Sequence, residues 1–322
     1  MNIIETHALT RDYGKMRAVD RLDMHVAAGE IYGFVGKNGA GKSTAMKMLA
    51  GLVNPSSGEI ELFGASLRSR RARQGFSRIG ALIEDPGVLP TFSALENLMC
   101  KALALGVVRP DAHCRELLEL VGLEDSGPLP VKKFSLGMKQ RLGLALALVG
   151  GPDLLLLDEP FNGLDPESTR AMRGALVRLN RERGVTMVIS SHVLDQLDRM
   201  ATSFGVIRAG RMVRELSMDD LHRECGSSIR VRTNDPARAL AILEEALPGA
   251  VLRAEPDGSI LASAPARNAA TSFGGAAADP MAPSAEDVAR PLTDHGQLIL
   301  ELSHLERDIE EYFVELMGGA DA

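Results

Sequence analysis

A glycine-rich segment, Gly36-Lys37-Asn38-Gly39-Ala40-Gly41-Lys42-Ser43-Thr44, fits the pattern of a loop that binds phosphate groups. Glycines let successive backbone N–H groups turn toward the phosphates, and the start of a following helix adds a partial positive charge. Lys42 would supply a full positive charge, and Ser43 a hydroxyl ligand for Mg²⁺. The phosphate-binding residues expected here are Gly36, Asn38, Gly39, Ala40, Gly41, Lys42, Ser43 and Thr44.

Two carboxylates, Asp158 and Glu159, follow the apolar run Leu154 to Leu157. The run reads as a buried strand, and ligands bind at the carboxyl ends of strands in parallel sheets. Asp158 would hold Mg²⁺ through water, and Glu159 would polarise the water that attacks a terminal phosphate. An apolar strand followed by Asp-Glu is a weak signal alone. Together with the phosphate loop it predicts a hydrolytic site.

The elements that must position these residues alternate along the chain. Ile31 to Val35 reads as a buried strand before the phosphate loop, and Lys42 to Leu49 as the helix after it. Pro166 to Arg183 is helical in pattern, and Val185 to Ser190 reads as another buried strand. Such alternation predicts a parallel α/β sheet that is covered on both faces. A helical period dominates from about residue 90 to 150, which predicts a helical subdomain there.

Further motifs carry a family resemblance. Phe134-Ser135-Leu136-Gly137-Met138-Lys139-Gln140-Arg141 precedes the Asp-Glu strand, Asn162-Gly163-Leu164-Asp165 follows it, and His192 comes after two serines. With Tyr13 and the phosphate loop, roughly residues 1–216 resemble the ATP-binding subunit of ABC transporters. The resemblance implies a parallel-sheet core with an antiparallel β subdomain and a helical subdomain. It also implies ATP hydrolysis, with ATP and Mg²⁺ at the site.

The resemblance gives further roles. Ser135 and Gly137 would reach the γ-phosphate held by a second copy of the chain, so a complete site needs two copies facing head to tail. Asp165 would lie in the loop at that interface. His192 would hydrogen-bond the γ-phosphate, and Tyr13 would stack on adenine. The alternative for His192 is a purely structural histidine, and for Tyr13 an ordinary surface tyrosine.

The sequence departs from the family pattern in two places. The usual family signature is Leu-Ser-Gly-Gly-Gln. In this chain Leu136 replaces the first glycine and Met138 replaces the glutamine, while Ser135 and Gly137 match the pattern. Glu84 stands where the family normally has a glutamine that joins Mg²⁺ to the membrane subunit interface, and a glutamate can still ligate the metal. Both departures resemble the bacitracin-export and lantibiotic self-protection group. The alternative is that Glu84 drifted in a generic multidrug or polysaccharide exporter.

The resemblance also implies partners. A separately encoded permease would dock on residues from about Asp85 to Leu98, with Pro86 and Phe92 as contacts, and would export a peptide antibiotic or drug. The chain would be cytoplasmic, held at the inner face of the membrane by that permease. Import is one alternative. A soluble ABC ATPase acting on ribosomes or DNA is another, although the chain has one phosphate loop and lacks room for a long coiled coil.

The C-terminal part differs in charge and texture. Residues 1–215 carry a net charge of +4 and residues 216–322 a net charge of −11, which argues against nucleic acid as a partner and predicts a domain boundary at 216/217. Residues 217–322 read as a small α+β accessory or regulatory domain. Within it, residues of about 264–285 are rich in Ala, Pro, Gly and Ser and predict a flexible insertion. Ser303 and Glu306 stand at capping-box spacing before a final helix.

Overall fold

The structure is a computed structural model, and it describes residues 1–67, 75–225, 227–263, 283–306 and 309–318. The chain divides into two compact units. The first comprises Met1–Met218 together with the chain from Leu316 onward, and the second comprises Asp219–Glu315. The expected boundary at 216/217 and the accessory role of the second unit remain predictions.

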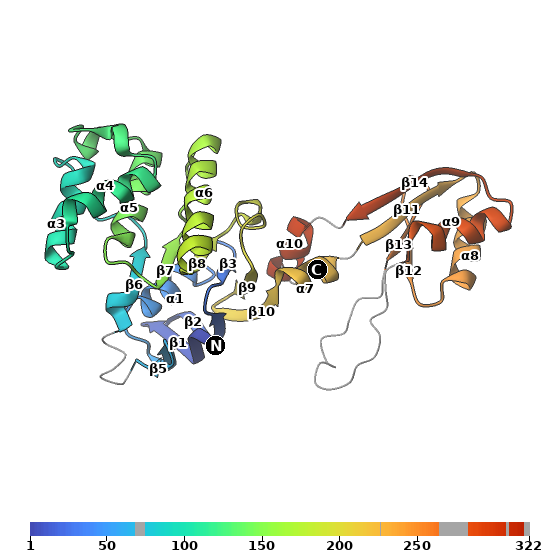
Figure 1. Cartoon of the computed structure of the whole chain (residues 1–322). Coiled ribbons are helices and arrows are strands. Elements are labelled where there is room, and N and C mark those ends of the chain that lie inside the picture. Colours follow the sequence, from blue (N-terminus) through green and yellow to red (C-terminus); the bar gives the residue numbers. More distant parts are fainter. Residues whose placement is uncertain (68–74, 226, 264–282, 307–308, 319–322) are drawn as a thin grey trace. The chain divides into compact units, whose positions relative to one another are not determined.

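A six-stranded sheet forms the centre of the first unit, in the order β10-β9-β3-β8-β7-β6 (Figure 1). Neighbouring strands from β9 to β6 are parallel, and β10 pairs with β9 in the antiparallel sense. Every residue of β3, β7 and β8 is buried, as expected for parallel strands with both faces covered. The strands are β3 (Ile31–Val35), β6 (Ile79–Leu82), β7 (Leu154–Asp158), β8 (Thr186–Ser191), β9 (Ser203–Arg208) and β10 (Arg211–Ser217).

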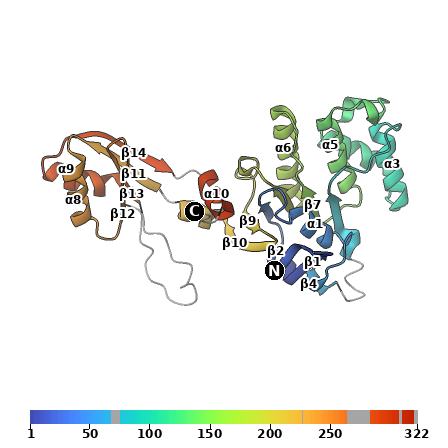
Figure 2. The ribbon, with the colours of Figure 1, turned by 180° about the vertical axis from the view of Figure 1, so that it is seen from behind.

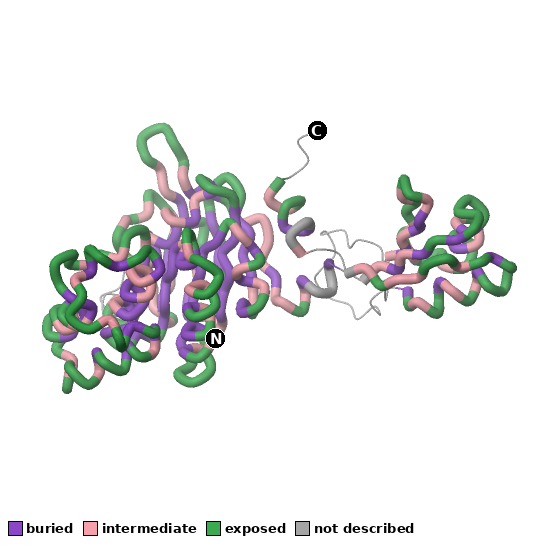
Figure 3. Tube along the Cα trace, turned by 90° about the horizontal axis from the view of Figure 1, so that it is seen from above, coloured by how far each residue is buried: buried purple, intermediate pink, exposed green. Residues whose placement is uncertain are grey.

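A second, antiparallel sheet has the order β2-β1-β4-β5. Its strands are β1 (Asn2–Tyr13), β2 (Met16–Ala27), β4 (Ser57–Leu62) and β5 (Ala65–Ser66). Helix α1 (Lys42–Leu49) packs between the two sheets, because its buried Met46 and Leu49 share one core with Ile4 of β1 and Leu156 of β7. Figure 3 shows the buried residues of this unit concentrated along these strands. The shared core fixes the start of α1 against the central sheet.

The helical part of the first unit lies between β6 and β7. Helices α3, α4 and α5 pack on one another, and α5 also contacts β6 (Figure 1). Each has a recognisable start: Ser93 caps α3 in a capping box, Pro110 begins α4, and Ser135 caps α5. The elements are α3 (Ala94–Ala104), α4 (Pro110–Leu120), α5 (Leu136–Leu148), and the 3₁₀ turns η1 (Phe76–Arg78), η2 (Glu124–Ser126) and η3 (Val131–Lys133).

Helix α6 (Pro166–Arg183) and the 3₁₀ turn η4 (Leu194–Gln196) complete the elements around the central sheet. The bounds of α6 agree with the sequence prediction because its end signals are strong. Asp165 caps the N-terminus and Pro166 stands in the first turn, while Gly184, with a φ of 65°, ends the helix. Among the described helices, none combines the length and the apolar character that crossing a membrane requires.

The second unit is a small α+β fold whose antiparallel sheet has the order β12-β13-β11-β14. Helices α8 and α9 lie side by side against this sheet (Figure 2), and their buried Leu243 and Val288 share a core with Val231. Together with the first unit, this agrees with the expected fold class. The elements are β11 (Ser227–Thr233), α8 (Pro236–Ala246), β12 (Val251–Ala254), β13 (Ser259–Ser263), α9 (Ala285–Asp294) and β14 (Ile299–Glu306). Helices α7 (Met218–Cys225) and α10 (Ile309–Gly318) flank them in the chain.

Two local expectations for this part were wrong. The capping box at Ser303 and Glu306 does not form, because both residues lie in β14 and pair with Arg230 and Ser227 of β11. Ala285 belongs to α9 and not to the expected insertion. Residues 264–282 of that insertion lie outside the residues that the structure describes. The sequence does carry the signal for α9, since Ser284 and Asp287 form a capping box.

Asp257 gives the second unit a pH-dependent contribution to its stability. Hydrogen bonds from Ser259 and the charge of Arg230 lower the pKa of Asp257 to about 2. A depressed carboxylate pKa stabilises the fold above its unfolded value, and this contribution is lost as the pH falls from about 4 toward 2. We expect Ser259→Ala to raise the pKa of Asp257, as measured by NMR titration of the carboxyl carbon. An unchanged midpoint would contradict the assigned cause.

Candidate functional site

The phosphate loop connects β3 to α1, and two of its glycines are required by close contacts. A Cβ on Gly36 would lie 2.5 Å from the Ile207 carbonyl oxygen of β9. Gly41 has a φ of 108°, and a Cβ there would lie 2.5 Å from the Ala18 carbonyl oxygen. Any side chain at these positions would displace the neighbouring backbone. The loop is therefore held between β9 and β2, at the carboxyl end of β3.

Lys42 is the first residue of α1, directly after the loop, and it is buried. Its Nζ donates a hydrogen bond of 2.6 Å to the Gly36 carbonyl oxygen and lies 3.3 Å from Glu159 Oε1. A buried ammonium group needs such partners, because leaving it unpaired away from water is costly. The contacts place the positive charge of the loop directly beside the carboxylate at the end of β7.

Asp158 is buried at the end of β7, opposite Ser190 of β8. The Ser190 hydroxyl donates to Asp158 Oδ1 at 2.5 Å and accepts the backbone N–H of Glu159 at 2.9 Å. One serine thus fixes both acidic residues. Our sequence reasoning did not single out Ser190, although its place at the end of a buried strand, two residues before His192, was a usable signal.

Glu159 adopts a left-handed backbone conformation with a φ of 48°. Such a φ costs energy for a residue with a side chain, and it is concentrated at functional sites. The Glu159 carboxylate lies between two side chains, with Oε2 2.8 Å from His192 Nδ1 and Oε1 3.3 Å from Lys42 Nζ. Because an ionised carboxylate only accepts hydrogen bonds, Nδ1 carries the proton in this pair.

The oxygen Oε1 of Glu159 is buried and accepts no hydrogen bond, since Lys42 lies at ion-pair distance without the alignment of a hydrogen bond. A buried acceptor of this kind can accept a hydrogen bond from a ligand or a water molecule. The site thus presents a fixed ammonium, a fixed carboxylate and one unused acceptor. This arrangement is suited to phosphate binding and to the orientation of an attacking water.

Mg²⁺ prefers oxygen ligands, and the Ser43 hydroxyl and the Asp158 carboxylate form a suitable donor set. Glu84, the third expected metal ligand, has a φ of 62°, and its Oε1 lies 2.6 Å from Lys47 Nζ. This carboxylate raises the pKa of Lys47 above its ordinary value, and Asp158 adds a smaller effect in the same direction.

Acidic residues also gather outside this site. Within the described part of the chain, Glu5, His7 and Glu61 form the one group of three acidic or histidine side chains with converging ligand atoms. It lies on the antiparallel sheet and does not include Glu84 or Asp158. In the structure, Glu84 is therefore a partner of Lys47 rather than part of a preformed metal cluster.

The chain is similar to known proteins along its whole length. A family model described as ABC transporter matches residues 19–162. The bacitracin transport ATP-binding protein BcrA of Bacillus licheniformis is 36% identical over 317 residues, which cover 98% of each chain. The lantibiotic transport ATP-binding protein SrtF of Streptococcus pyogenes is 39% identical over 67% of this chain and 92% of its own. The chain belongs to the ABC transporter family.

Solved structures of ABC ATPases share the fold. The structure of cbiO1 from Clostridium perfringens, part of the cbiONQ transporter complex, has a TM-score of 0.61 at 25% identity and covers 77% of this chain and 96% of its own. A dimeric ATP-binding cassette bound to ADP and phosphate also has a TM-score of 0.61, at 22% identity, over 67% of this chain and 98% of its own. The protein is therefore an ATP-binding ABC ATPase, which confirms the predicted family, fold and enzyme class.

The segment that we predicted to be the ABC signature lies at the start of α5. Ser135 caps this helix by accepting the Met138 backbone N–H at 3.2 Å. A Cβ on Gly137 would lie 2.8 Å from Ser168 Oγ of α6, so the glycine permits close packing of the two helices. Leu136 is exposed and packs against Gly163. A Cβ added to Gly163 would lie 2.7 Å from Leu136 Cδ2. The start of α5 thus packs against the loop that contains Gly163 and against the first turn of α6.

Asp165 caps α6 and lies in the same region. Its carboxylate accepts the Ser168 backbone N–H at 2.8 Å and the Ser168 hydroxyl at 2.9 Å, and these bonds lower the pKa of Asp165. Ser168 therefore contacts both the signature helix and the Asp165 loop. No sequence pattern singled out Ser168, because its contact with Gly137 joins two separate helices.

Tyr13 ends β1, and 41% of its surface is exposed. The Arg11 guanidinium carbon lies 4.6 Å from the centre of the Tyr13 ring. A cation stacked on an aromatic face is attracted by the ring electrons. The adenine-stacking role of Tyr13 remains a prediction.

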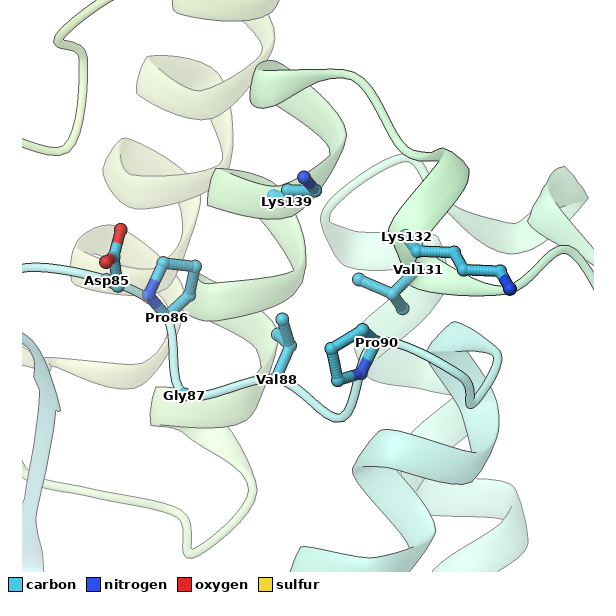
Figure 4. A pocket seen from close by; sticks show the side chains of 8 residues that line it. All are labelled: Asp85, Pro86, Gly87, Val88, Pro90, Val131, Lys132 and Lys139. Carbon is cyan, nitrogen blue, oxygen red and sulfur yellow. The ribbon is translucent and has the colours of Figure 1, made fainter.

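A groove of about 420 Å³ lies between the segment after β6 and the helical part of the protein. Figure 4 shows Asp85 to Pro90 passing beneath α5 and η3, with Val88 and Pro90 close to Val131. Lys132 and Lys139 contribute two positive charges to its lining. Pro86 lines this groove, and Phe92 is 38% exposed six residues further along the chain.

Proposed function

We propose that two copies of this chain bind two MgATP molecules head to tail and drive a separately encoded permease that exports a peptide antibiotic. The observation that carries the cargo class is the similarity to the bacitracin transport protein BcrA. It covers 98% of both chains and so includes the second unit as well as the ATPase unit. The shorter lantibiotic transport relative supports the same class of cargo.

In this proposal the residues at the end of β3 and β7 perform the hydrolysis. Lys42 and the backbone N–H groups of the phosphate loop bind the phosphates. Glu159 orients the attacking water and takes its proton, and His192 holds the Glu159 carboxylate in place. Bound Mg²⁺, held by Ser43 and through water by Asp158, would neutralise charge on the phosphates.

The second copy would complete each site. Ser135 is exposed on the single chain and begins a helix, whose N-terminal N–H groups favour an anion. Ser135 and Gly137 of one copy would contact the γ-phosphate held by the other, with Asp165 beside them. Binding of ATP would then close the dimer, because both copies hold the same phosphate, and hydrolysis would reopen it.

The permease would dock in the groove between Asp85–Pro90 and η3, which places the ATPase at the inner face of the membrane. Two lysines, Lys132 and Lys139, favour a partner segment that carries carboxylates. The apolar Val88 and Val131 favour an apolar side chain beside them. Asp85, which lines the groove, directly follows Glu84 in the chain, so an occupant of the groove would influence Glu84 through this segment.

The proposal is tested by a pull-down from native membranes with the Glu159→Gln protein and MgATP. We expect a multi-span membrane protein to copurify, and we expect expression of the pair to raise resistance to bacitracin or a lantibiotic. The Lys139→Glu variant should recover less of the membrane protein, because it reverses a charge in the groove. Recovery of ribosomal or DNA-bound proteins alone would contradict the transporter function.

A further inference from the structure

The ion pair between Lys47 and Glu84 connects two parts of the ATP site that are distant in the sequence. Lys47 lies on α1 four residues after Ser43, so the two side chains share one face of the helix. Glu84 follows β6, which pairs with β7, the strand that ends at Asp158. The pair therefore joins the helix that carries Ser43 to the segment that enters the groove.

The other acidic groups of the site already have partners. Asp158 accepts the Ser190 hydroxyl, and Glu159 lies against Lys42 and His192. Glu84 adds a further negative charge beside α1, the helix that begins at the phosphate loop. Lys47 is its ion-pair partner in the structure. Without that cation, the Glu84 carboxylate would repel the phosphates and be free to attract a metal ion.

The pair is placed so that it can be exchanged. The side chains of Glu84 and Lys47 are 65% and 26% exposed. Ion pairs in contact with water are worth little, because solvent screens them and the side chains lose freedom in forming them. A weak ion pair can position the Glu84 carboxylate. A divalent cation attracts the same carboxylate more strongly and can replace Lys47 as its partner.

We propose that Lys47 is a positioning residue that holds Glu84 away from the metal and phosphate positions, so that Lys47 and Mg²⁺ compete for the Glu84 carboxylate. This inference rests on the proposed function, in which the site binds MgATP. It assigns a physical reason for tolerating a glutamate at this position.

The competition is measured as the Mg²⁺ concentration that half-saturates the fluorescence change of a bound, non-hydrolysable fluorescent ATP analogue. Lys47→Met should lower this concentration about two- to fivefold, the size of a partly exposed ion pair. In a Glu84→Gln protein the same Lys47 change should have no effect, because no carboxylate is released. Lys47→Arg retains the pair and should stay near wild type.

Lys133→Met, which removes the same charge from η3, serves as the control for net charge and should leave the Mg²⁺ requirement unchanged. Should Lys47→Met fail to fold, Lys47→Gln provides the same comparison. Equal shifts with Glu84 and with Gln at position 84, or no shift with Glu84, would overturn the inference. Failure of the wild-type chain to bind the analogue at saturating Mg²⁺ would instead contradict the proposed nucleotide site.

Discussion

Glu159→Gln is expected to lower ATP turnover by about 10²- to 10⁴-fold, the range for loss of a general base. Glutamine keeps the size of the side chain, and its amide oxygen can still face Lys42. It cannot take a proton from water, however, so hydrolysis slows while MgATP binding persists. Phosphate release measures the turnover, and equilibrium binding of ATP measures the affinity.

The same variant should accumulate as a dimer in MgATP, as measured by light scattering, because each unhydrolysed γ-phosphate continues to join the two copies. Glu182→Gln is the matched control, since it removes an exposed carboxylate from the far end of α6. Wild-type turnover in Glu159→Gln would show that another group accepts the proton. A variant that neither hydrolyses nor binds ATP would point to a structural role for Glu159.

Lys42→Met is expected to weaken ATP binding about 10- to 100-fold, because a hydrogen bond to a charged group contributes about 1.5–3 kcal/mol. The Lys42 ammonium is buried and donates a hydrogen bond to the Gly36 carbonyl oxygen. None of the contacts described above provides a second cation at this position. Methionine has a similar length, so the loop retains its packing while the positive charge is lost.

Lys37→Met is the matched control, because Lys37 belongs to the same loop but its side chain is exposed. Isothermal titration with MgATP compares the two variants, and thermal melting shows whether both are folded. Equal affinities would mean that the backbone N–H groups bind the phosphates without help from Lys42. A loss in both variants would indicate damage to the loop rather than loss of a specific contact.

Local patterns explain why much of the fold followed from the sequence. The strand from Ile31 to Val35 and the helix from Pro166 to Arg183 have the predicted bounds. The strand is continuously apolar, and the helix is marked at both ends by capping residues. Such signals lie within a few residues of the element that they define, so no knowledge of distant contacts is needed. The phosphate loop and the Asp158-Glu159 pair are local in the same way.

Errors arose where a distant strand decided the structure or where the neighbouring sequence hid a local signal. Ser303 and Glu306 have the spacing of a helix start, yet β11 provides a strand with which this segment pairs, and β14 forms instead. Helix α9 was missed because its capping box follows an Ala- and Pro-rich stretch that reads as unstructured. In both cases a local preference was outweighed or masked by its context.

The sequence by itself determined the family, the α/β fold and the residue types of the ATP site, because each of these is carried by a contiguous motif. Only the tertiary structure decided which groups meet: Ser190 with Asp158, Lys42 and His192 with Glu159, and Lys47 with Glu84. These contacts join side chains from separate strands and helices. Their formation depends on the order of strands in the central sheet and on the packing of α1 against it, and neither is encoded in residue spacing along the chain.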